Sequence, residues 1–404
     1  MKHTHLFLAF LIIGLLLVSC DNDAAGDESV LSATEERSDG SESFASDSGS
    51  ATTPTGNGNG NGTGGEAGLV TAAEWNDLDN WSFWKELLQT EDFANKADLW
   101  NFHNLNRISV LVKNETGAPV NDTPVSLQKD GTIIWEAKTD NFGTAELLIG
   151  SRQSISEIAM EDYTLFIDNK TMPTPVKLFD EGINEFVLAN TDAAGTKVEL
   201  AFIVDATGSM SDELEFLKKD LLSVIEKVEQ ESPSLDIMTA SVFYRDEGDD
   251  YVVKHSGFAS STKTTLDFIR AQSADGGGDF PEAVHTALNT ALSELQWSGR
   301  ARTRIAFLLL DAPPHNNTSV IGQLQNAIME AAKKGIKIIP ITASGIDKET
   351  EYLMRSFSIA TNGTYVFITN DSGIGNDHLE ASVGEYQVEK LNDLMVRLIT
   401  KYSE

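Results

Sequence analysis

The chain has 404 residues, with 62 acidic against 30 basic side chains and a formal net charge of −32. This charge balance argues against nucleic-acid binding, which requires a basic surface that displaces counterions from phosphates. Cys20 is the only cysteine in the chain, which excludes internal disulfides, cysteine-ligated zinc, iron–sulfur clusters and paired redox thiols.

The N-terminus has the pattern of an export signal. Residues 1–19 begin with a positive charge, continue with an apolar stretch too short to span a membrane, and end directly before Cys20. The segment 17–20, Leu-Val-Ser-Cys, resembles a bacterial lipobox. The resemblance implies a diacylglyceryl group on the Cys20 thiol, cleavage before Cys20, and acylation of the new amine with a chain such as palmitate. We therefore expect a lipoprotein whose contact with the membrane is the lipid anchor alone, because several acyl chains bind a bilayer firmly.

The residues after Cys20 bear on localisation. The acidic segment 21–23 resembles the signal that directs some lipoproteins to the outer face of the outer membrane in Gram-negative bacteria. In other lineages Asp21 resembles an inner-membrane retention signal. We expect the outer membrane, with surface exposure, and leave the inner membrane as the alternative. Residues 20–67 are rich in Ser, Gly, Asp and Asn, and we predict a disordered linker.

Two further segments precede the C-terminal half. Residues 69–104 are rich in tryptophan, and the spacing of Trp81, Trp84 and Leu88 predicts a helical segment that docks on the next domain. Residues 105–190 alternate short apolar runs with turn signals, which predicts a β-sandwich. The stretch 117–143 resembles immunoglobulin-like or carboxypeptidase-regulatory-like spacer domains of exported proteins.

The C-terminal half, residues 195–404, alternates strands and helices. The predicted strands are residues 198–204, 237–244, 251–258, 304–310, 336–341 and 364–369, and the predicted helices are residues 211–230, 264–271, 281–295, 320–334, 348–359 and 388–401. This alternation predicts an α/β domain with a doubly wound, mostly parallel sheet and helices on both faces. Ligands of such sheets bind beyond the carboxyl ends of the strands. Residues 247–250 are predicted to form a plain hairpin turn.

Three loops at predicted strand ends carry oxygen-bearing side chains. They are residues 205–211, 275–282 and 311–315. Carboxylates and hydroxyls without sulfur ligands suit Mg²⁺, Mn²⁺ or Ca²⁺ rather than zinc. The alternative for the first loop is a strand-to-helix turn in which Ser209 or Ser211 caps the helix.

The first loop carries a family resemblance. Asp205, Thr207 and Ser209 resemble the DxSxS motif of von Willebrand factor type A domains, with Thr at the middle position. The resemblance implies a metal-ion-dependent adhesion site. The Thr207 and Ser209 hydroxyls would bind the ion directly. Asp205 and Asp311 would either bind the ion or contact a group that binds it. An Asp or Glu of a protein partner would complete the coordination.

The second loop departs from the usual pattern, because it offers no threonine. It has Asp279 and Glu282 instead, which resembles the version in integrin β-subunits and leaves both residues as candidate ligands. An additional carboxylate would tighten metal binding while weakening the attraction for a partner's carboxylate.

Three functions follow as hypotheses. The leading one is a membrane-anchored, divalent-cation-dependent protein-binding lipoprotein, active in adhesion or as a scaffold. The second is a Mg²⁺-dependent hydrolase with Asp205 as nucleophile, although a phosphohydrolase of the haloacid-dehalogenase type would need a second Asp where this chain has Thr207. The third is a structural surface lipoprotein with a vestigial metal site.

Overall fold

The computed structural model describes residues 67–155, 157–189, 191 and 195–404. The predicted signal peptide, the lipidation site Cys20 and the linker up to residue 66 lie outside the described residues. Within the described residues no helix has both the length and the apolar character needed to cross a bilayer.

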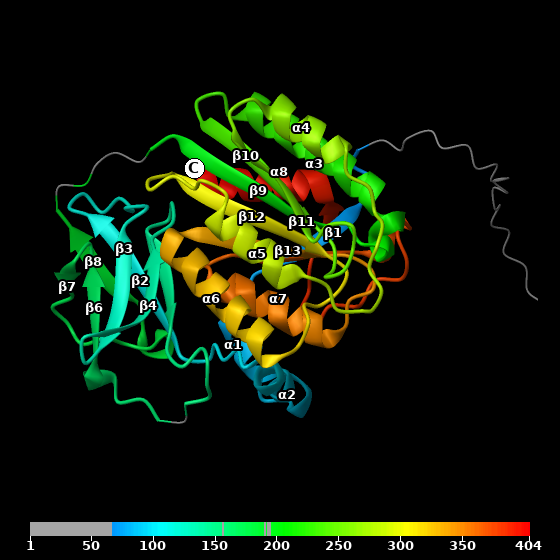
Figure 1. The fold of residues 1–404 in the computed structure, drawn as a ribbon. Coiled ribbons are helices and arrows are strands. Elements are labelled where there is room, and N and C mark those ends of the chain that lie inside the picture. The colour runs from blue at the N-terminus through cyan, green and yellow to red at the C-terminus, as the bar shows by residue number, and fades with distance from the viewer. Residues whose placement is uncertain (1–66, 156, 190, 192–194) are drawn as a thin grey trace, which may run out of the picture. The chain divides into compact units, whose positions relative to one another are not determined.

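The centre of the C-terminal half is a sheet of eight strands, counted over the described residues, in the order β11-β10-β9-β12-β13-β14-β1-β15. Five neighbouring strands run parallel: β10 (Asp236–Tyr244), β9 (Lys197–Asp205), β12 (Thr303–Leu310), β13 (Ile336–Thr342) and β14 (Tyr365–Ile368). The edge strand β11 (Val253–Ala259) pairs antiparallel with β10. The mostly parallel sheet predicted from the sequence is therefore confirmed (Figure 1).

Helices cover both faces of this sheet (Figure 1). Successive residues of β9 point to opposite faces: Phe202 belongs to the same buried cluster as residues of α3 and α8, and Ile203 to the same cluster as residues of α5, α6 and α7. The helices are α3 (Leu214–Glu231), α4 (Thr262–Arg270), α5 (Val284–Ser293), α6 (Thr318–Lys334), α7 (Lys348–Ala360) and α8 (Leu391–Ser403).

The tryptophan-rich segment corrects two expectations. It contains the predicted helices, α1 (Trp81–Leu87) and α2 (Glu91–Trp100), but it opens with a strand, β1 (Thr71–Trp75). β1 lies inside the sheet, antiparallel to both β14 and β15 (Val388–Lys390). The α/β domain is therefore not confined to residues 195–404, and the segment is not wholly helical. No strand was predicted for these five residues, because they lack strong apolar alternation and their pairing partners lie about three hundred residues away in the chain.

Between β1 and β9 the chain forms what we call the two-sheet unit, residues 107–188. In the described part of the chain one sheet has the order β5-β2-β8 and the other β4-β3-β6-β7. Buried residues of both sheets share one hydrophobic cluster. The bounds are β2 (Arg107–Asn114), β3 (Pro124–Lys129), β4 (Thr132–Lys138), β5 (Thr144–Leu148), β6 (Tyr163–Ile167), β7 (Lys170–Thr171) and β8 (Asn184–Leu188). The immunoglobulin-like assignment stays a prediction.

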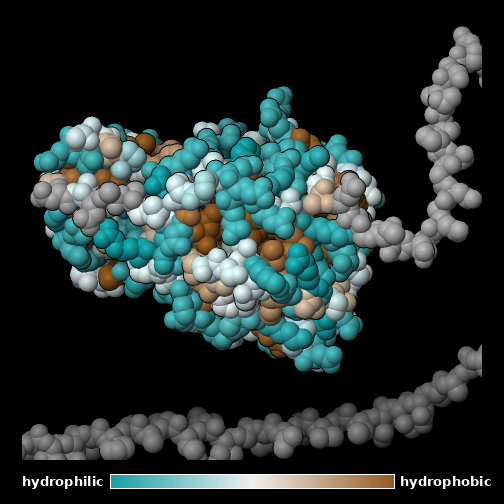
Figure 2. Space-filling view, turned by 90° about the horizontal axis from the view of Figure 1, so that it is seen from above, coloured by the Kyte–Doolittle hydropathy of each residue, from teal (hydrophilic) through white to brown (hydrophobic). Residues whose placement is uncertain are grey.

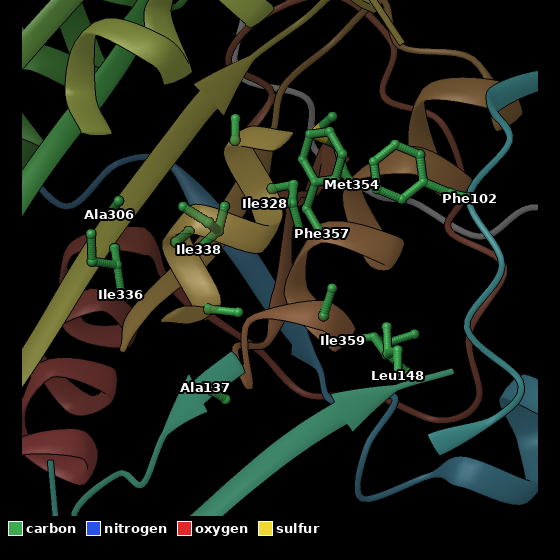
Figure 3. Close-up of a cluster of buried hydrophobic side chains, with 14 of the residues drawn as sticks. Phe102, Ala137, Leu148, Ala306, Ile328, Ile336, Ile338, Met354, Phe357 and Ile359 are labelled. Atoms are coloured by element: carbon green, nitrogen blue, oxygen red, sulfur yellow. The ribbon is translucent and has the colours of Figure 1, made fainter. Parts of the chain in front are cut away.

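The two-sheet unit shares its hydrophobic cluster with the α/β domain. Figure 3 shows Ala137 of β4 and Leu148 of β5 together with Ile328 of α6 and Phe357 of α7. These side chains are all less than 7% exposed, so separating the unit from the helices would expose apolar surface to water.

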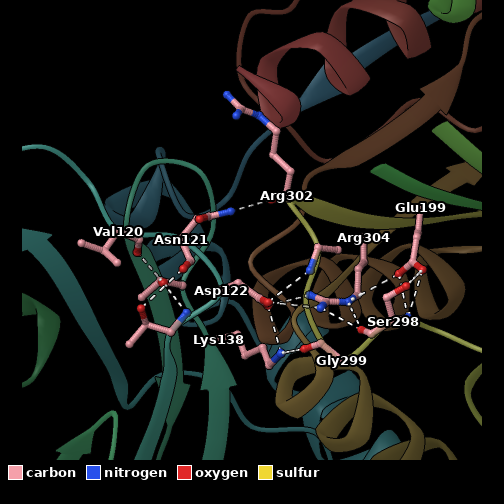
Figure 4. A network of polar contacts seen from close by, with 12 residues as sticks. Val120, Asn121, Asp122, Lys138, Glu199, Ser298, Gly299, Arg302 and Arg304 are labelled. Atoms are coloured by element: carbon pink, nitrogen blue, oxygen red, sulfur yellow. Dashed lines mark hydrogen bonds and ion pairs between the residues drawn. The ribbon is translucent and has the colours of Figure 1, made fainter. Parts of the chain in front are cut away.

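A polar network joins the same two parts at the amino ends of the parallel strands (Figure 4). Asp122, between β2 and β3, accepts from Arg304 of β12 at 2.8 Å and from Lys138 at 2.9 Å. The Arg304 guanidinium also donates to the Ser298 carbonyl at 2.9 Å, and the Ser298 amide donates to Glu199 of β9 at 3.0 Å. The two-sheet unit is thus bonded to the edge of the sheet from which β9 and β12 start.

Candidate metal centre

The opposite edge of the sheet holds the candidate site. β9 and β12 are parallel neighbours, and the chain continues from β9 to β10 on the side away from β12. Such a change of direction opens a crevice beyond the carboxyl ends of the two strands. Asp205 is the last residue of β9, and Asp311 directly follows β12. The topology therefore brings these two carboxylates together, as the sequence predicted.

The loop after β9 is built around Asp205. One carboxylate oxygen accepts from the Thr207 amide at 2.9 Å and from the Thr207 hydroxyl at 2.7 Å. The Thr207 hydroxyl lies 3.1 Å from the Ser209 hydroxyl, within a short 3₁₀ helix, Gly208–Asp212. Helix α3 begins at Leu214 without a side-chain cap. The structure therefore does not support the alternative in which a serine of this loop serves as a helix cap.

The second loop separates the two carboxylates that the sequence left open. Glu282 is 2% exposed, whereas Asp279 is exposed on the rim of the same pocket. The Glu282 amide donates to the Pro313 carbonyl at 2.8 Å, which ties this loop to the one after β12. The pocket is lined by Ser209, Asp279, Glu282 and Asp311, among others. Glu282 is thus the stronger candidate for a direct ligand.

Close backbone packing brings the loops together. Gly277 has a positive φ of 71°, and a Cβ at this position would lie 3.0 Å from the Glu282 carboxylate and 3.3 Å from Thr207 Cβ. A larger residue would force the loop away from Thr207. Gly277 therefore has a geometric role in placing Glu282 beside the first loop.

The candidate site contains several buried carboxylates that lack part of their hydrogen bonding. Asp205 Oδ2, Glu282 Oε2 and Asp311 Oδ1 are buried and have no hydrogen-bond partner among the described residues. Burial and the neighbouring carboxylates raise the pKa of Glu282 to about 9. Burial, followed by the charge of Asp205, raises the pKa of Asp311, and burial raises the pKa of Asp205. Unpaired buried carboxylates cost free energy unless a cation or a proton neutralises them.

The residues present fit a hard divalent cation. In the part of the chain that the structure describes, no three carboxylate, imidazole or thiol groups are placed to hold a metal by themselves. A coordination shell at this place would therefore need oxygens besides the carboxylates, and the Thr207 and Ser209 hydroxyls lie beside Asp205. An oxygen-only donor set of this kind favours Mg²⁺, Mn²⁺ or Ca²⁺.

Sequence reasoning missed the contribution of the turn between β10 and β11. The Asp249 carboxylate accepts from the Gly277 amide at 2.9 Å and from the Asp246 amide at 3.1 Å. Asp246 in turn lies 2.8 Å from His315 Nε2. The turn was predicted correctly as a turn, but its acidic side chains reach the site loops. No sequence signal distinguishes them from solvated turn residues, because the contacts are between distant segments.

Residues 199–375 match the family model described as the von Willebrand factor A domain. A putative ariadne-like RING finger protein of Acanthamoeba polyphaga mimivirus is 34% identical over 122 residues, 30% of this chain and 12% of that protein. Alpha-protein kinase vwkA of Dictyostelium discoideum is 31% identical over 172 residues, 42% of this chain and 27% of the kinase. The chain thus spans less than a third of either relative's length.

Two solved structures show a limited likeness. One is the conserved hypothetical protein BatB from Bacteroides thetaiotaomicron, with 14% identity and a TM-score of 0.35, covering 52% of this chain and 99% of that chain. The other is an aerotolerance-related membrane protein from Bacteroides fragilis, with 14% identity and a TM-score of 0.33, covering 51% of this chain and 100% of that chain. Likenesses of this size support no inference about function. The family match covers the strands β9 and β12 and the three loops of the site, so residues 199–375 are similar to a von Willebrand factor A domain.

Proposed function

We propose that this chain is a lipid-anchored, divalent-cation-dependent protein-binding module of the bacterial cell envelope. One observation carries the cation dependence. Asp205, Glu282 and Asp311 each keep a buried oxygen that has no hydrogen-bond partner in the described part of the chain, at an edge of the sheet where Thr207 and Ser209 supply hydroxyls. A Mg²⁺ or Mn²⁺ ion held there by these side chains would leave a coordination position for an Asp or Glu of a partner protein.

The site geometry supports binding rather than catalysis. The Asp205 side chain is fully buried, and one of its oxygens accepts two hydrogen bonds from Thr207. A nucleophile has to reach the substrate, and this carboxylate is held beneath the first loop. We therefore propose a non-enzymatic role in adhesion or as a scaffold, rather than a phosphohydrolase with Asp205 as nucleophile.

The exposed rim supports a protein as the ligand. Phe280, 47% exposed, and Asp279 lie on the rim of the pocket lined by Ser209 and Glu282. Figure 2 shows one face of the molecule, mostly hydrophilic, with hydrophobic residues gathered near its middle. An exposed aromatic side chain next to a charged site is typical of a surface that packs against a partner.

Calorimetry tests the cation dependence. Mg²⁺ or Mn²⁺ is expected to raise the melting temperature of the folded chain, and EDTA to lower it, because a ligand at a hundred times its Kd stabilises by about 2.7 kcal/mol. Ser209→Ala should reduce this response, whereas Ser211→Ala, an exposed serine two residues on, should not. The same response in both variants would count against the site, and no response in the wild type would leave only the vestigial hypothesis.

Partner binding and anchoring have separate tests. Capture of proteins from a cell-surface extract should depend on Mg²⁺ and be lost with Ser209→Ala or EDTA. The lipid anchor is proposed from the sequence, since Cys20 is the only thiol and ends a lipobox. Cys20→Ser should abolish labelling by a fatty-acid probe and release the protein from the envelope; unchanged labelling would refute the anchor. Fractionation of the wild type would then assign the membrane, for which we propose the outer membrane.

A further inference from the structure

We propose that Asp249 and Asp246, in the turn between β10 and β11, are positioning residues of the metal centre. Their proposed role is to hold the 275–282 loop and the 311–315 loop against the first loop, so that Glu282 and Asp311 face Thr207. The inference rests on the proposed cation site but concerns residues outside its donor set.

The contacts link four segments: the second loop, the third loop and the turn form a closed ring, and the first loop is bonded to the second. The Gly208 amide donates to the Gly276 carbonyl at 3.0 Å, which joins the first loop to the second. The Glu282 amide donates to the Pro313 carbonyl at 2.8 Å, which joins the second loop to the third. The third loop returns to the turn through His315, at 2.8 Å from Asp246. The Asp249 carboxylate closes the ring on Gly277.

Asp249 is the residue on which this ring depends most. A single oxygen, Oδ2, accepts from the Gly277 amide at 2.9 Å and from the Asp246 amide at 3.1 Å. Gly276 has a positive φ of 79°, and a Cβ there would collide with the Asp249 carboxylate. The glycine-rich loop therefore packs directly against the Asp249 carboxylate. Without it, the Gly277 amide would lose its acceptor, and the backbone that presents Glu282 would lose a restraint.

Asp246 anchors the other side of the ring. Its side chain is 8% exposed and pairs with His315, four residues after Asp311. Groups that orient a metal ligand commonly affect metal affinity by about 10- to 100-fold, although they do not touch the ion. The turn is thus placed to act on both Glu282 and Asp311 at once.

The experiment measures Mn²⁺ alone binding to the full chain by titration calorimetry. Asp249→Ala should weaken binding by about 10- to 100-fold. Asp249→Asn keeps a carbonyl oxygen that can accept both hydrogen bonds, so it should stay within about threefold of the wild type. Asp250→Ala, an exposed acid in the same turn, is the matched control and should bind like the wild type. Equal losses in Asp249→Ala and Asp249→Asn would mean that the charge acts, and would overturn the positioning role.

Amide hydrogen exchange separates this inference from the cation proposal. In the metal-free protein, Asp249→Ala should accelerate exchange across residues 275–282, and Asp249→Asn should not. His315→Ala, at a partly exposed position, should open the ring more mildly from its other side. If the wild type failed to bind Mn²⁺, the proposed function would fail while exchange still tested the ring. Equal exchange rates in the wild type and Asp249→Ala would overturn the inference, whether or not the protein binds Mn²⁺.

Discussion

Buried carboxylates at the two ends of the parallel strands differ in whether the protein places a positive charge beside them. At the amino ends of the strands, Glu199 and Asp122 contact the guanidinium of Arg304, and Asp140 lies 3.0 Å from Lys337. At the carboxyl ends, Asp205, Glu282 and Asp311 each retain an oxygen without a hydrogen-bond partner in the described structure. The carboxylates are buried at both edges, so the two edges differ in where the neutralising positive charge comes from.

This difference is the one we expect between a permanent joint and the proposed binding site. Buried charges are tolerated when opposite charges and hydrogen bonds compensate for lost hydration. The chain provides its own cations where the two-sheet unit meets β9, β12 and β13, so that edge is complete without a ligand. At the other edge it provides hydroxyls and carboxylates, and we propose that a cation from solution supplies the countercharge there.

The largest expected effect comes from deleting β1 and the two-sheet unit, which supplies acidic residues at the amino ends of the parallel strands. A fragment of residues 195–404 lacks β1 and also Asp122 and Asp140, so Lys337 loses the Asp140 carboxylate and Arg304 loses the Asp122 carboxylate while keeping Glu199. It should fail to unfold cooperatively, whereas residues 67–404 should give one cooperative transition in circular dichroism. A cooperative melt of the short fragment would show that β1 and the two-sheet unit are dispensable.

A single substitution at the same edge should have the next largest effect. Arg304→Ala leaves Asp122 and Glu199 buried without their guanidinium, and removing one partner of a buried pair costs about 3–5 kcal/mol. Urea unfolding of the full chain measures this loss. Lys263→Ala is the control, because its side chain is 78% exposed and should change stability by less than about 0.5 kcal/mol. Similar losses in both variants would contradict the comparison.

The carboxyl edge should respond to substitution with the opposite sign. Because folding raises the pKa of Glu282 from its ordinary value of 4.5 to about 9, the folded state binds this proton more tightly. Its contribution is present at low pH and is lost as the pH rises through that range. In EDTA at pH 8, Glu282→Gln should therefore be more stable than the wild type, by over about 1.4 kcal/mol, the equivalent of one pKa unit.

Urea midpoints between pH 5 and 9 check this sign. The advantage of Glu282→Gln should shrink toward pH 5, and it should disappear or reverse in saturating Mg²⁺, because the ion stabilises the ionised carboxylates. A destabilised Glu282→Gln at pH 8 in EDTA would show that the carboxylate is already neutralised by a group of the protein.

The smallest effect is expected at Asp279. Its side chain is exposed on the rim, where solvent screens its charge, so Asp279→Asn should change Mn²⁺ affinity by less than about threefold. Calorimetric titration beside Glu282→Gln decides between the two carboxylates that the sequence left open. A larger loss with Asp279→Asn would reverse the assignment made from burial.

Local patterns were sufficient for much of the fold and for the placement of Asp205 and Asp311 at one edge of the sheet. The apolar run of residues 198–204 predicted β9, and the alternation of strands and helices predicted the parallel sheet that the structure contains. Asp205 and Asp311 could be paired from sequence alone, since the carboxyl ends of parallel strands meet at one edge. These inferences succeeded because each depends on periodicity or on residues adjacent to a strand end.

Tertiary structure decided what depends on distant pairing. The sequence determined an acidic chain with one cysteine, an α/β half and the residues of the first loop. It did not reveal β1, which pairs with β14 and β15, or the role of Asp249. It also left Asp279 and Glu282 equal, and burial separated them. The physical reason is the same throughout: a five-residue strand, a turn carboxylate and a loop ligand acquire their roles from partners that only the folded chain brings within a few ångströms.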